Sequence, residues 1–583
     1  MKYSKDVAIA CFSALVLCWL PAVAQDAGPP PVTDAMLQDP DPQDWLMWRR
    51  TLNSWGHSPL DEINRNNVGN LRMAWTRTLQ SGIQEGTPLV YDGVMYFPNP
   101  GDIIQAIDAG TGDLIWEYVR DLPPDLADYF PVPDINRNLA IYGNLIIDTS
   151  SDDYVFALDV ATGELVWENL ILEYSAGAQQ TSGPIIGNGK IISGRGCEPE
   201  AGPDACIVTA HDAASGEELW RTRTIPAPHE PGGDTWGDVP FEKRWHVGTW
   251  MVPSYDPELN LIYVGTSVTS PAPKFMLAGN DEQYLYHNST LAIDADTGDI
   301  VWYYQHLVDH WDLDHPFERL LVDTVVAPNP EAVSWINPNI RSGEVRKVVT
   351  GIPGKTGIVY TLDRETGEFL WARPTVLQTV VENIEGSTGV VEVASDMLYT
   401  GAEQTRFVCP TSTGGKNWPA GAYSPETNAM YMPLQNTCAT VRSTSEEPSL
   451  DELYAISGVP EIAPGTENVG SVHAISAETG ETLWIHEQPA GATSLIVTDG
   501  GLVFSGDAAG WFRALDQETG EVLWETELGA QVTGYPATFA VDGKQYVAVS
   551  TGRSLTTLSL MRLVDDEFRA GVETNLYVFA LPD

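Results

Sequence analysis

Basic residues are scarce in this chain of 583 residues. It contains 31 Lys and Arg against 80 Asp and Glu, which gives a formal net charge of −49. Nucleic acids and anionic membrane surfaces carry charge of the same sign and would repel such a protein. The composition therefore argues against both as partners and fits a basic protein partner better.

Long apolar runs are also scarce. One extends from Val7 to Leu20, follows Lys2 and Lys5, and precedes the cleavage-site pattern Ala22-Val23-Ala24. This pattern predicts a secretory signal peptide over residues 1–24, cleaved after Ala24. The run is too short to span a bilayer comfortably. We therefore predict a mature chain that is exported to the periplasm without membrane insertion.

Cysteine is the third scarcity. The chain has six, and the signal peptide removes Cys11 and Cys18. An exported protein keeps its disulfides, and four cysteines allow three pairings. None of them forms C-x-x-C-H, which excludes a covalent c-type haem. The pairing that closes the shortest loops is Cys197–Cys206 with Cys409–Cys438.

What the chain has in abundance is one repeated phrase, Ala-x-Asp-x-x-Thr-Gly-x-x-x-Trp. Seven copies, with small deviations such as Ser215 for Thr and Ser476 for Asp, are far beyond chance and indicate a repeat protein. Asp can cap a turn and Gly supplies its positive φ, so each copy predicts a β-hairpin with a Trp at a fixed place. The copies lie at residues 106–116, 157–167, 210–220, 292–302, 361–371, 474–484 and 514–524.

Strand–turn–strand units with periodic Gly and Trp are typical of a β-propeller. An eighth unit is split, with one strand at Leu71–Trp75 and its partner at Tyr577–Leu581. Pairing them would close the ring and remove two sheet edges. We therefore predict an all-β, eight-bladed propeller over residues 61–583, preceded by an N-terminal leader over residues 25–60.

Two intervals between repeats are long. The distance between successive repeat Trp residues grows to 82 before Trp302 and to 113 before Trp484. Insertions of this kind are surface loops, which carry binding and catalytic residues more often than the scaffold does. We expect them to form the rim of a site.

The stretch from Asp309 to His315 is the main candidate for chemistry. If it is extended, Asp312 and Asp314 point the same way, and their repulsion calls for a cation such as a hard metal ion between them. A solvated acidic loop is the plain alternative.

Through these Trp repeats, nearly all of the mature chain resembles the quinoprotein alcohol dehydrogenases, which are methanol- and ethanol-dehydrogenase-like enzymes. The cofactor of that family is pyrroloquinoline quinone (PQQ). The resemblance implies a propeller with PQQ over its axis beside a metal ion. Trp311-Asp312 matches the family's catalytic base, and Asp314 matches an extra aspartate of the lanthanide-using members. Glu198, in Ser-Gly-Arg-Gly-Cys-Glu, matches a metal ligand.

The resemblance also implies a set of cofactor contacts. A polyanionic cofactor needs cations and hydroxyls around its carboxylates and an aromatic face for its ring. Trp250 matches the floor under the ring, Lys355 a cation beside the reactive carbonyls, and Cys409–Cys438 a structural disulfide. Singly, each such residue is more often core or solvated surface. The implied cofactor contacts are Glu85, Arg137, Thr181, Gly196, Cys197, Thr249, Trp250, Lys355, Asn417 and Trp418.

The sequence departs from the family at three places. The adjacent cysteines that cap the quinone in methanol and ethanol dehydrogenases are replaced by Pro131-Val-Pro-Asp134, and Cys197–Cys206 is one candidate cap. The metal-binding Asn is missing, so Thr269 or Ser270 or a water is expected in its place. A capping Trp is replaced near Gly491-Ala492, which implies a roomier pocket.

The predicted function is oxidation of a primary or secondary alcohol to an aldehyde or ketone. The predicted substrates include bulky alcohols. Asp312 is the expected base, and the metal, a lanthanide(III) ion or Ca²⁺, is expected to bind Glu198, Asp312, Asp314 and Thr269. A separate electron acceptor, a c-type cytochrome, is expected because the chain has no haem motif. The alternatives are a scaffold propeller of the outer-membrane assembly type, which would lack these site residues, and a metal-dependent propeller hydrolase without a quinone.

Overall fold

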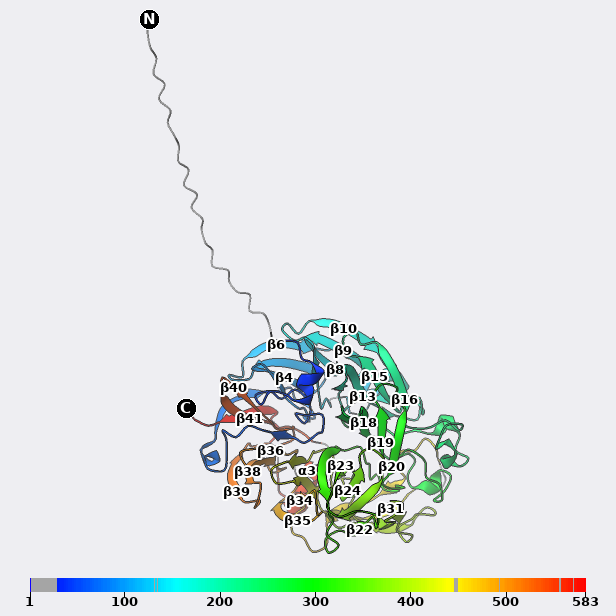
Figure 1. The fold of residues 1–583 in the computed structure, drawn as a ribbon. Helices are drawn as coiled ribbons and strands as arrows, with labels where there is room; N and C mark the ends of the chain where they lie inside the picture. Colours follow the sequence, from blue (N-terminus) through cyan, green and yellow to red (C-terminus); the bar gives the residue numbers. More distant parts are fainter. Residues whose placement is uncertain are drawn as a thin grey trace.

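The computed structural model describes residue 1 and residues 29–130, 132–133, 135–444, 449–491, 493–554, 557–569 and 571–582. Apart from Met1, the predicted signal peptide lies outside them, as do Pro131, Asp134 and Ala492. Eight sheets in the described chain contain four antiparallel strands in succession. Figure 1 shows these sheets following one another around the molecule in chain order, from blue to red.

The first four sheets come from the first half of the chain. Their strands are β3 (Leu89–Tyr91), β4 (Val94–Asn99), β5 (Ile103–Asp108) and β6 (Leu114–Val119); β7 (Ala140–Tyr142), β8 (Leu145–Thr149), β9 (Tyr154–Asp159) and β10 (Leu165–Leu170); β12 (Ile185–Gly187), β13 (Lys190–Gly194), β15 (Ile207–Asp212) and β16 (Glu218–Arg223); and β17 (Ser254–Asp256), β18 (Leu261–Gly265), β19 (Ser289–Asp294) and β20 (Ile300–Gln305).

The other four complete the circle. Their strands are β21 (Leu320–Val326), β23 (Glu344–Gly351), β24 (Ile358–Asp363) and β25 (Phe369–Pro374), with β22 (Trp335–Ile336) at the edge; β29 (Ala422–Ser424), β30 (Ala429–Gln435), β34 (Gly470–Ser476) and β35 (Thr482–Gln488); β36 (Ile496–Thr498), β37 (Leu502–Gly506), β38 (Trp511–Asp516) and β39 (Val522–Glu527), with β1 (His57–Ser58) at the edge; and β40 (Ala537–Val541), β41 (Lys544–Ser550), β42 (Asn575–Ala580) and β2 (Arg72–Thr78).

The last sheet joins the two ends of the chain. β2 pairs antiparallel with β42, with Trp75 opposite Val578 and Thr78 opposite Asn575. The predicted pairing of the first and last strands is therefore confirmed, and the number of such sheets equals the predicted number of blades.

The repeated phrase forms the joints between sheets. In the copy of the repeat at residues 157–167, β9 ends at Asp159. Oδ1 of Asp159 accepts a hydrogen bond of 3.0 Å from the amide of Thr162, and Gly163 follows with φ +71°. A Cβ on Gly163 would lie 2.5 Å from the ring of Trp116, the repeat Trp of the preceding sheet, so only glycine fits beneath that ring. The same close approach recurs for Gly112 and Trp75, Gly216 and Trp167, Gly298 and Trp220, Gly367 and Trp302, and Gly520 and Trp484, whereas at Gly480 the ring of Trp371 is 3.1 Å away and Val333 is nearer.

Burial distinguishes the inner and outer strands of each sheet. First strands such as β3 and β36 are buried along their whole length, whereas last strands such as β6 and β10 alternate between exposed and more buried positions. This alternation is typical of an edge strand that has one solvated face. The first strands therefore line the axis and the last strands form the perimeter.

The leader packs against the first strands. The amide of Trp45 donates to Val90 (2.8 Å), and the amides of Tyr255 and Tyr423 donate to the carbonyls of Leu52 and Trp55 (3.0 and 2.8 Å). β1 adds a parallel pair to β36. Residues 32–58 are thus held to several sheets at once.

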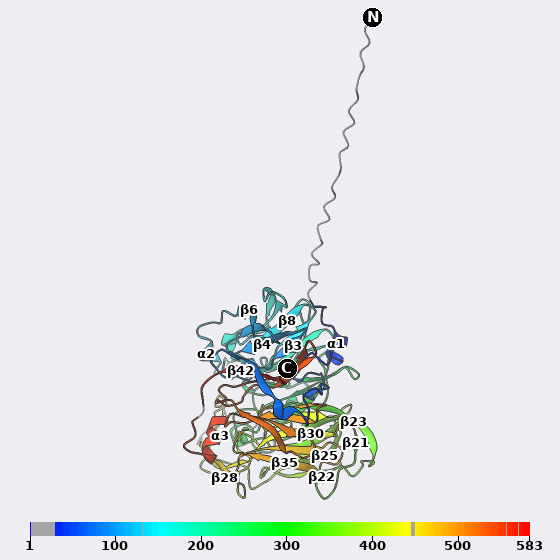
Figure 2. The same cartoon turned by 90° about the vertical axis from the view of Figure 1, so that its left-hand side faces the viewer.

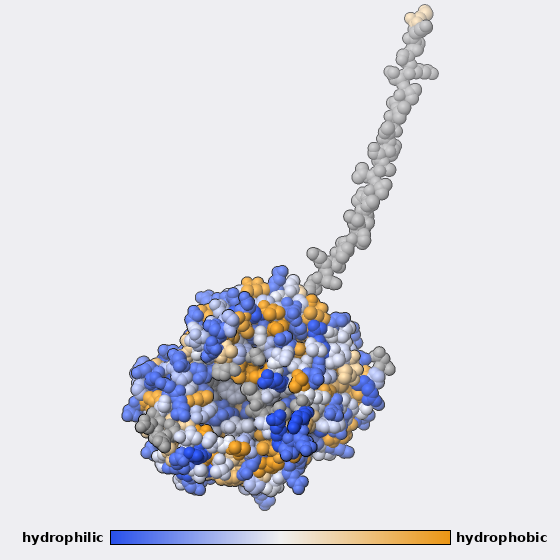
Figure 3. Space-filling model, turned by 180° about the vertical axis from the view of Figure 1, so that it is seen from behind, coloured by the Kyte–Doolittle hydropathy of each residue, from blue (hydrophilic) through white to orange (hydrophobic). Residues whose placement is uncertain are grey.

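Smaller elements decorate both faces. Figure 2 shows α1 on one side of the molecule and α3 with β28 on the other. In the part of the chain described, no helix is long and apolar enough to cross a membrane. The surface in Figure 3 is mainly hydrophilic and is hollowed near its centre. The remaining elements are α1 (Asp34–Gln38), η1 (Val68–Asn70), α2 (Leu126–Tyr129), η2 (Tyr174–Ala176), β11 (Ala178–Gln179), β14 (Gly196–Cys197), η3 (Gly233–Trp236), η4 (Phe241–Lys243), η5 (Lys274–Met276), β26 (Val381–Ile384), β27 (Val391–Val393), β28 (Thr405–Val408), β31 (Thr437–Ser443), β32 (Ile456–Ser457), β33 (Pro460–Ile462) and α3 (Thr557–Val564).

Candidate active site

Most of the predicted site residues occupy equivalent places in successive sheets. Arg137, Thr181, Trp250, Asp312 and Trp418 each lie in the loop that leads into a first strand, namely β7, β12, β17, β21 and β29. Because first strands line the axis, these loops meet at one end of it. Residues more than 250 positions apart in sequence therefore come together.

These loops enclose a cavity of about 370 Å³, which we call the cofactor cavity. Its size lies within the range of small-molecule sites. Eight predicted residues line it, and Glu85, Cys197, Thr249, Glu198, Asp314 and Thr269 do not. The lining residues that were predicted are Arg137, Thr181, Gly196, Trp250, Asp312, Lys355, Asn417 and Trp418.

Arg137 is the centre of one wall. Its guanidinium pairs with Glu85 at 2.7 Å, donates to the carbonyl of Thr181 at 3.1 Å, and lies 5.2 Å from the centre of the Trp250 ring. Glu85 is fully buried, so its charge is balanced by Arg137 rather than by water. Glu85 thus holds Arg137 from behind instead of facing the cavity.

Two Trp residues supply flat surfaces. Trp250 packs edge-on against Phe317, and Trp418 packs against Tyr535, whose hydroxyl donates to the Trp418 carbonyl at 3.0 Å. The indole nitrogen of Trp418 is buried and has no acceptor among the described residues. Asn417 is fixed by a bond of 2.9 Å from its amide to the carbonyl of Thr413. The cavity thus presents aromatic faces, and Trp418 carries a buried donor without a partner beside it.

The Asp309–His315 stretch is not extended, so the condition under which Asp312 and Asp314 would point the same way is not met. Asp312 has φ +63°, a conformation that is uncommon outside glycine, and no strand covers the stretch. The carboxylate of Asp309 accepts bonds from the amides of Trp311 and Leu313 at 2.8 and 2.5 Å. This cap bends the chain and turns Asp312 into the cavity. Strain of this type is concentrated at functional sites.

Asp312 and Asp314 nevertheless converge on one cation. The ammonium nitrogen of Lys355 lies 2.8 Å from Oδ1 of Asp312 and 3.0 Å from Oδ2 of Asp314. Oδ1 of Asp314 also accepts a bond of 2.8 Å from the amide of Val268. The ammonium of Lys355 therefore supplies a positive charge between the two carboxylates.

Asp312, Asp314 and Lys355 shift one another's pKa values. Burial, opposed by Lys355 and reinforced by Asp314, raises the pKa of Asp312 to about 7. Burial alone would raise the pKa of Asp314, but Lys355 and His246 bring it below its ordinary value. Burial opposes the charge of Lys355, yet the two carboxylates keep its pKa above the ordinary value. Asp312 is thus the group of the three suited to exchange a proton near neutral pH.

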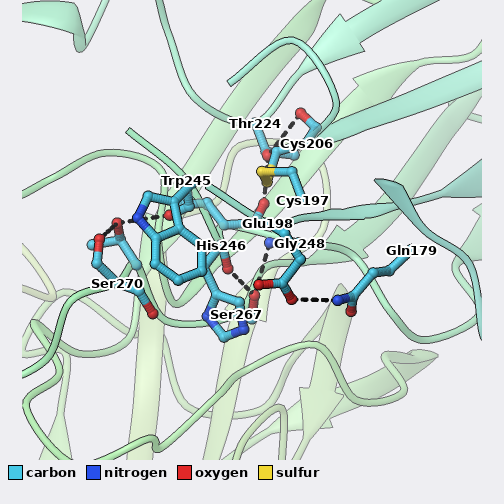
Figure 4. The surroundings of a disulfide bond; sticks show 12 residues. Gln179, Cys197, Glu198, Cys206, Thr224, Trp245, His246, Gly248, Ser267 and Ser270 are labelled. Carbon is cyan, nitrogen blue, oxygen red and sulfur yellow. Dashed lines mark hydrogen bonds between the residues drawn. A yellow bond between two sulfur atoms is a disulfide. The ribbon is translucent and has the colours of Figure 1, made fainter. Parts of the chain in front are cut away.

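The Cys197–Cys206 disulfide, whose surroundings are drawn in Figure 4, directly follows the cavity-lining Gly196 in the chain. It confirms the predicted pairing, as does Cys409–Cys438. Gly196, next to it, lines the cavity, and a Cβ on Gly248 would lie 2.7 Å from the Gly196 Cα. Figure 4 also shows the carboxylate of Glu198 bonded to the side-chain amide of Gln179. Burial raises the pKa of Glu198.

Two predicted residues point elsewhere. The hydroxyl of Thr269 is buried and donates to the carbonyl of Trp245 at 3.0 Å. Thr249 is buried outside the lining, and its amide bonds to the Arg195 carbonyl at 3.2 Å. Within the described ranges, no three His, Cys, Asp or Glu side chains are grouped as a metal site. The predicted metal set is therefore not assembled as one cluster.

The sequence did not indicate several residues that line the cavity or that bind Asp312. The chief one is Tyr454, whose hydroxyl donates to Oδ1 of Asp312 at 3.0 Å. It lies in the insertion before Trp484, where the single sequence has no periodicity or motif to single it out. Val132 lies in the segment that replaces the family's adjacent cysteines, and the other lining residues that the sequence did not indicate are Ile135, Gln179, His246, Gly248, Ser267, Ser412 and Thr413.

Comparison with known proteins decides the family. The PQQ model for the glucose/ethanol/alcohol dehydrogenase β-propeller domain matches residues 45–383 and 466–547. The chain belongs to the PQQ-dependent alcohol dehydrogenases. The dehydrogenase subunit of the quinone alcohol dehydrogenase of Komagataeibacter europaeus is 30% identical, over 93% of this chain and 76% of that protein. Quinoprotein alcohol dehydrogenase PedH of Pseudomonas putida is 30% identical, over 89% and 88%.

Solved structures of the family have the same fold. The quinohemoprotein alcohol dehydrogenase ADHIIG of Pseudomonas putida matches with a TM-score of 0.82 and 27% identity, over 95% of this chain and 82% of that one. A europium-containing methanol dehydrogenase matches with a TM-score of 0.83 and 25% identity, over 94% and 99%. The family identifies the chain as an oxidoreductase rather than a scaffold propeller.

The residues around the cavity fit the family's cofactor. PQQ is planar and polyanionic, and the cavity offers two Trp surfaces and the cations Arg137 and Lys355, while the buried indole nitrogen of Trp418 has no partner. The fit of a metal is partial. Glu198, Asp312 and Asp314 are hard oxygen donors, but Lys355 fills the gap between the last two.

Proposed function

We propose that this protein oxidises an alcohol with PQQ bound in the cofactor cavity, with Asp312 as the base. The observation that carries this proposal is the placement of Asp312, with a raised pKa and a positive φ, in the lining of the cavity that Trp250 and Arg137 also line. PQQ, when bound, accepts the hydride from the carbinol carbon.

The chain's own groups have separate tasks in this scheme. Oδ1 or Oδ2 of Asp312 takes the hydroxyl proton of the alcohol, which frees the carbinol carbon to lose hydride. The charge of Lys355, 2.8 Å from Asp312, opposes the effect of burial and favours the ionised form of Asp312. Arg137 and Trp250 orient the cofactor, with Thr181, Gly196, Asn417 and Trp418 completing the wall. Glu85, Cys197 and Thr249 support this wall from behind.

We propose that a metal ion binds on the Asp312 side of the cavity. Glu198 and Asp312 would hold it, with Asp314 adjacent, and Thr269 would take part only through a change of its present bond to Trp245. Extra carboxylates favour a large ion of high charge. A lanthanide(III) ion is therefore the first candidate, and Ca²⁺ the second.

We further propose that the protein works in the periplasm and passes electrons to a separate carrier, a c-type cytochrome. The support is the predicted signal peptide, the absence of C-x-x-C-H from the sequence, and the net charge of −49, which would attract a basic partner.

Reconstitution tests this proposal directly. Apoprotein is loaded with PQQ and with La³⁺ or Ca²⁺, and dye reduction is measured with primary, secondary and bulky alcohols. Wild type should turn over at least one of them, while Asp312→Asn should retain the near-ultraviolet absorbance of bound PQQ and lose turnover. The proposal fails if wild type binds PQQ and oxidises no alcohol, or if Asp312→Asn remains active.

A further inference from the structure

Two charged side chains lie close to the cofactor cavity without lining it. Glu318 and Lys416 form an ion pair of 2.6 Å, and their side chains are 1% and 0% exposed. Glu318 precedes β21 and Lys416 precedes β29, so the pair joins two sheets across 98 positions of sequence. Neither residue belongs to the cavity lining described above, and neither takes part in the proposed reaction.

Each oxygen of the Glu318 carboxylate holds one end of the same loop. Oε2 pairs with the ammonium of Lys416 at 2.6 Å, and Oε1 accepts a hydrogen bond of 2.8 Å from the amide of Gly421. The loop between these two ends carries Asn417 and Trp418, which line the cofactor cavity. One buried carboxylate thus fixes both ends of a loop that carries two cavity residues.

The leader holds the far end of this loop from another side. Nη2 of Arg49 donates to the carbonyl of Gly421 at 2.8 Å, while the amide of Gly421 donates to Glu318. Arg49 is fully buried. The loop end is therefore bound both by the leader and by the segment that precedes β21.

The ion pair also contacts the second aromatic surface of the cavity. The ammonium of Lys416 lies 4.7 Å from the centre of the Phe317 ring, and that ring packs edge-on against Trp250 at 5.5 Å. Trp250 lines the cavity. A displacement of Lys416 therefore changes the packing against Trp250 as well as the loop that carries Trp418.

Stability alone does not explain an ion pair of this kind. Removing two charges from water costs about as much free energy as their attraction returns, and apolar residues of similar volume are often equally stable. The pair instead supplies direction, because a hydrogen bond to a carboxylate oxygen weakens steeply when the donor is misaligned. Two such bonds from one carboxylate restrict where the ends of the loop can lie.

We propose that Glu318 is a positioning residue, which fixes the loop of residues 416–421 in the shape that receives PQQ. The inference rests on the proposed binding of PQQ in the cofactor cavity. Lys416 completes the pair and transmits the same restraint to Trp250 through Phe317. The pair reduces the conformational freedom that the loop would otherwise lose when the cofactor binds, which raises the affinity.

Replacing both charges separates positioning from stability. Glu318→Gln/Lys416→Met removes both charges and keeps a carbonyl oxygen for the Gly421 amide, so the urea midpoint of unfolding should stay close to that of wild type. The affinity for PQQ, measured by absorbance titration of the apoprotein, should fall about ten-fold, which is the loss expected for roughly one well-placed hydrogen bond.

The matched control is a buried ion pair at the far end of a first strand. Asp256 ends β17, pairs with Arg364 at 2.7 Å, and accepts bonds of 2.8 and 3.1 Å from two backbone amides. Asp256→Asn/Arg364→Met makes the same exchange of charged for neutral groups. Trp250 precedes β17 whereas Asp256 ends it, and neither member of the control pair lines the cofactor cavity. PQQ affinity should therefore be unchanged in the control.

A more conservative variant and a second measurement test the loop itself. Glu318→Gln alone has nearly the volume of glutamate but only one carbonyl oxygen, so it cannot accept both bonds where they now lie. Hydrogen exchange in the apoprotein should become faster at the amides of residues 416–421 than in wild type. The amides of residues 257–260, next to the control pair, should exchange as in wild type.

The outcomes separate this role from the proposed function. If the double variant binds PQQ like wild type, or loses no more affinity than the control, Glu318 serves only stability and the inference is overturned. If wild type binds no PQQ, the proposed function fails and hydrogen exchange alone decides the inference. Unchanged exchange at residues 416–421 in Glu318→Gln then overturns the restraint on the loop, and faster exchange supports it.

Discussion

Tyr454 donates a hydrogen bond of 3.0 Å to Asp312 across a sequence separation of 142 residues. One partner lies in a loop that the repeat architecture places at the axis, and the other in an insertion. The bond fixes the orientation of the carboxylate. It also makes the base depend on a segment outside the repeats.

The first prediction is that Tyr454→Phe lowers kcat more than it changes KM. The variant keeps the ring and removes the donor, so Asp312 is held by Lys355 alone. We expect a fall in kcat of roughly ten-fold, about the effect of one bond of ~1.5 kcal/mol to a charged group. Tyr399→Phe is the control, because it removes a buried hydroxyl bonded to Val441 and not to Asp312. Equal kinetic losses in both variants would contradict the positioning role.

The second prediction concerns Glu85 and Arg137, which form a buried ion pair of 2.7 Å. Glu85→Gln should lower the free energy of unfolding by about 3 kcal/mol, because it leaves a buried guanidinium unpaired. PQQ affinity should fall with it, since Arg137 would lose its fixed position over Trp250. Glu403→Gln, in an exposed pair with Arg442, is the control and should change neither quantity much. Chemical denaturation and absorbance titration with PQQ measure the two effects.

The third prediction compares the two disulfides. Loops of 9 and 29 residues imply about 3 and about 4 kcal/mol of stabilisation. Replacing Cys197 and Cys206 by Ser should therefore reduce stability less than replacing Cys409 and Cys438. It should nevertheless weaken PQQ binding more, because Gly196 beside it lines the cofactor cavity. Free thiols at 197 and 206 in the native protein, or PQQ affinity that simply follows stability, would refute this.

The fourth prediction concerns acid stability. Burial, with a smaller effect of the charge of Arg373, lowers the pKa of His473 to about 4. A histidine whose pKa is depressed in the folded state contributes no penalty above pH ~6.5 and destabilises the fold as pH falls from there towards 4. At pH 5 the penalty is about 2 kcal/mol for this one residue. His473→Gln should therefore lose less stability than wild type between pH 7.5 and pH 5 in urea titrations. An identical loss in both would show that His473 does not titrate in this range.

The local chemistry of the chain explains what the sequence predicted well. Each Asp-x-x-Thr-Gly turn is formed by residues close together in the sequence, as at Asp159 and Gly163. The hairpins and the Trp residues that pack on them could therefore be predicted from the sequence alone. The pairing of β2 with β42 followed from the repeat count. Site residues such as Arg137 and Trp250 followed from the family pattern, and their convergence follows from equivalent positions before first strands.

Other features depend on contacts that no local pattern encodes. The turned backbone of Asp312 follows from the cap by Asp309, and an alternating pattern cannot distinguish this from a strand. Lys355 reaches Asp314 only because two loops meet at the axis. The path of the leader along the first strands, and the arrival of Tyr454 from an insertion, are set by tertiary packing alone.

The last prediction addresses the metal through Asp314. This residue places a second carboxylate beside Asp312 and shares Lys355 with it at 3.0 Å. Asp314→Asn keeps an acceptor for the Val268 amide and removes one negative charge. Because attraction scales with the charge of the ion, affinity for La³⁺ should fall more than affinity for Ca²⁺. Calorimetric titration of PQQ-loaded protein with each ion measures this, with the exposed Asp451→Asn as the control for net charge. If wild type binds Ca²⁺ and is active with it but neither binds La³⁺ nor is activated by it, the lanthanide proposal is wrong. Asp314 would then pair with Lys355 and would not bind the metal.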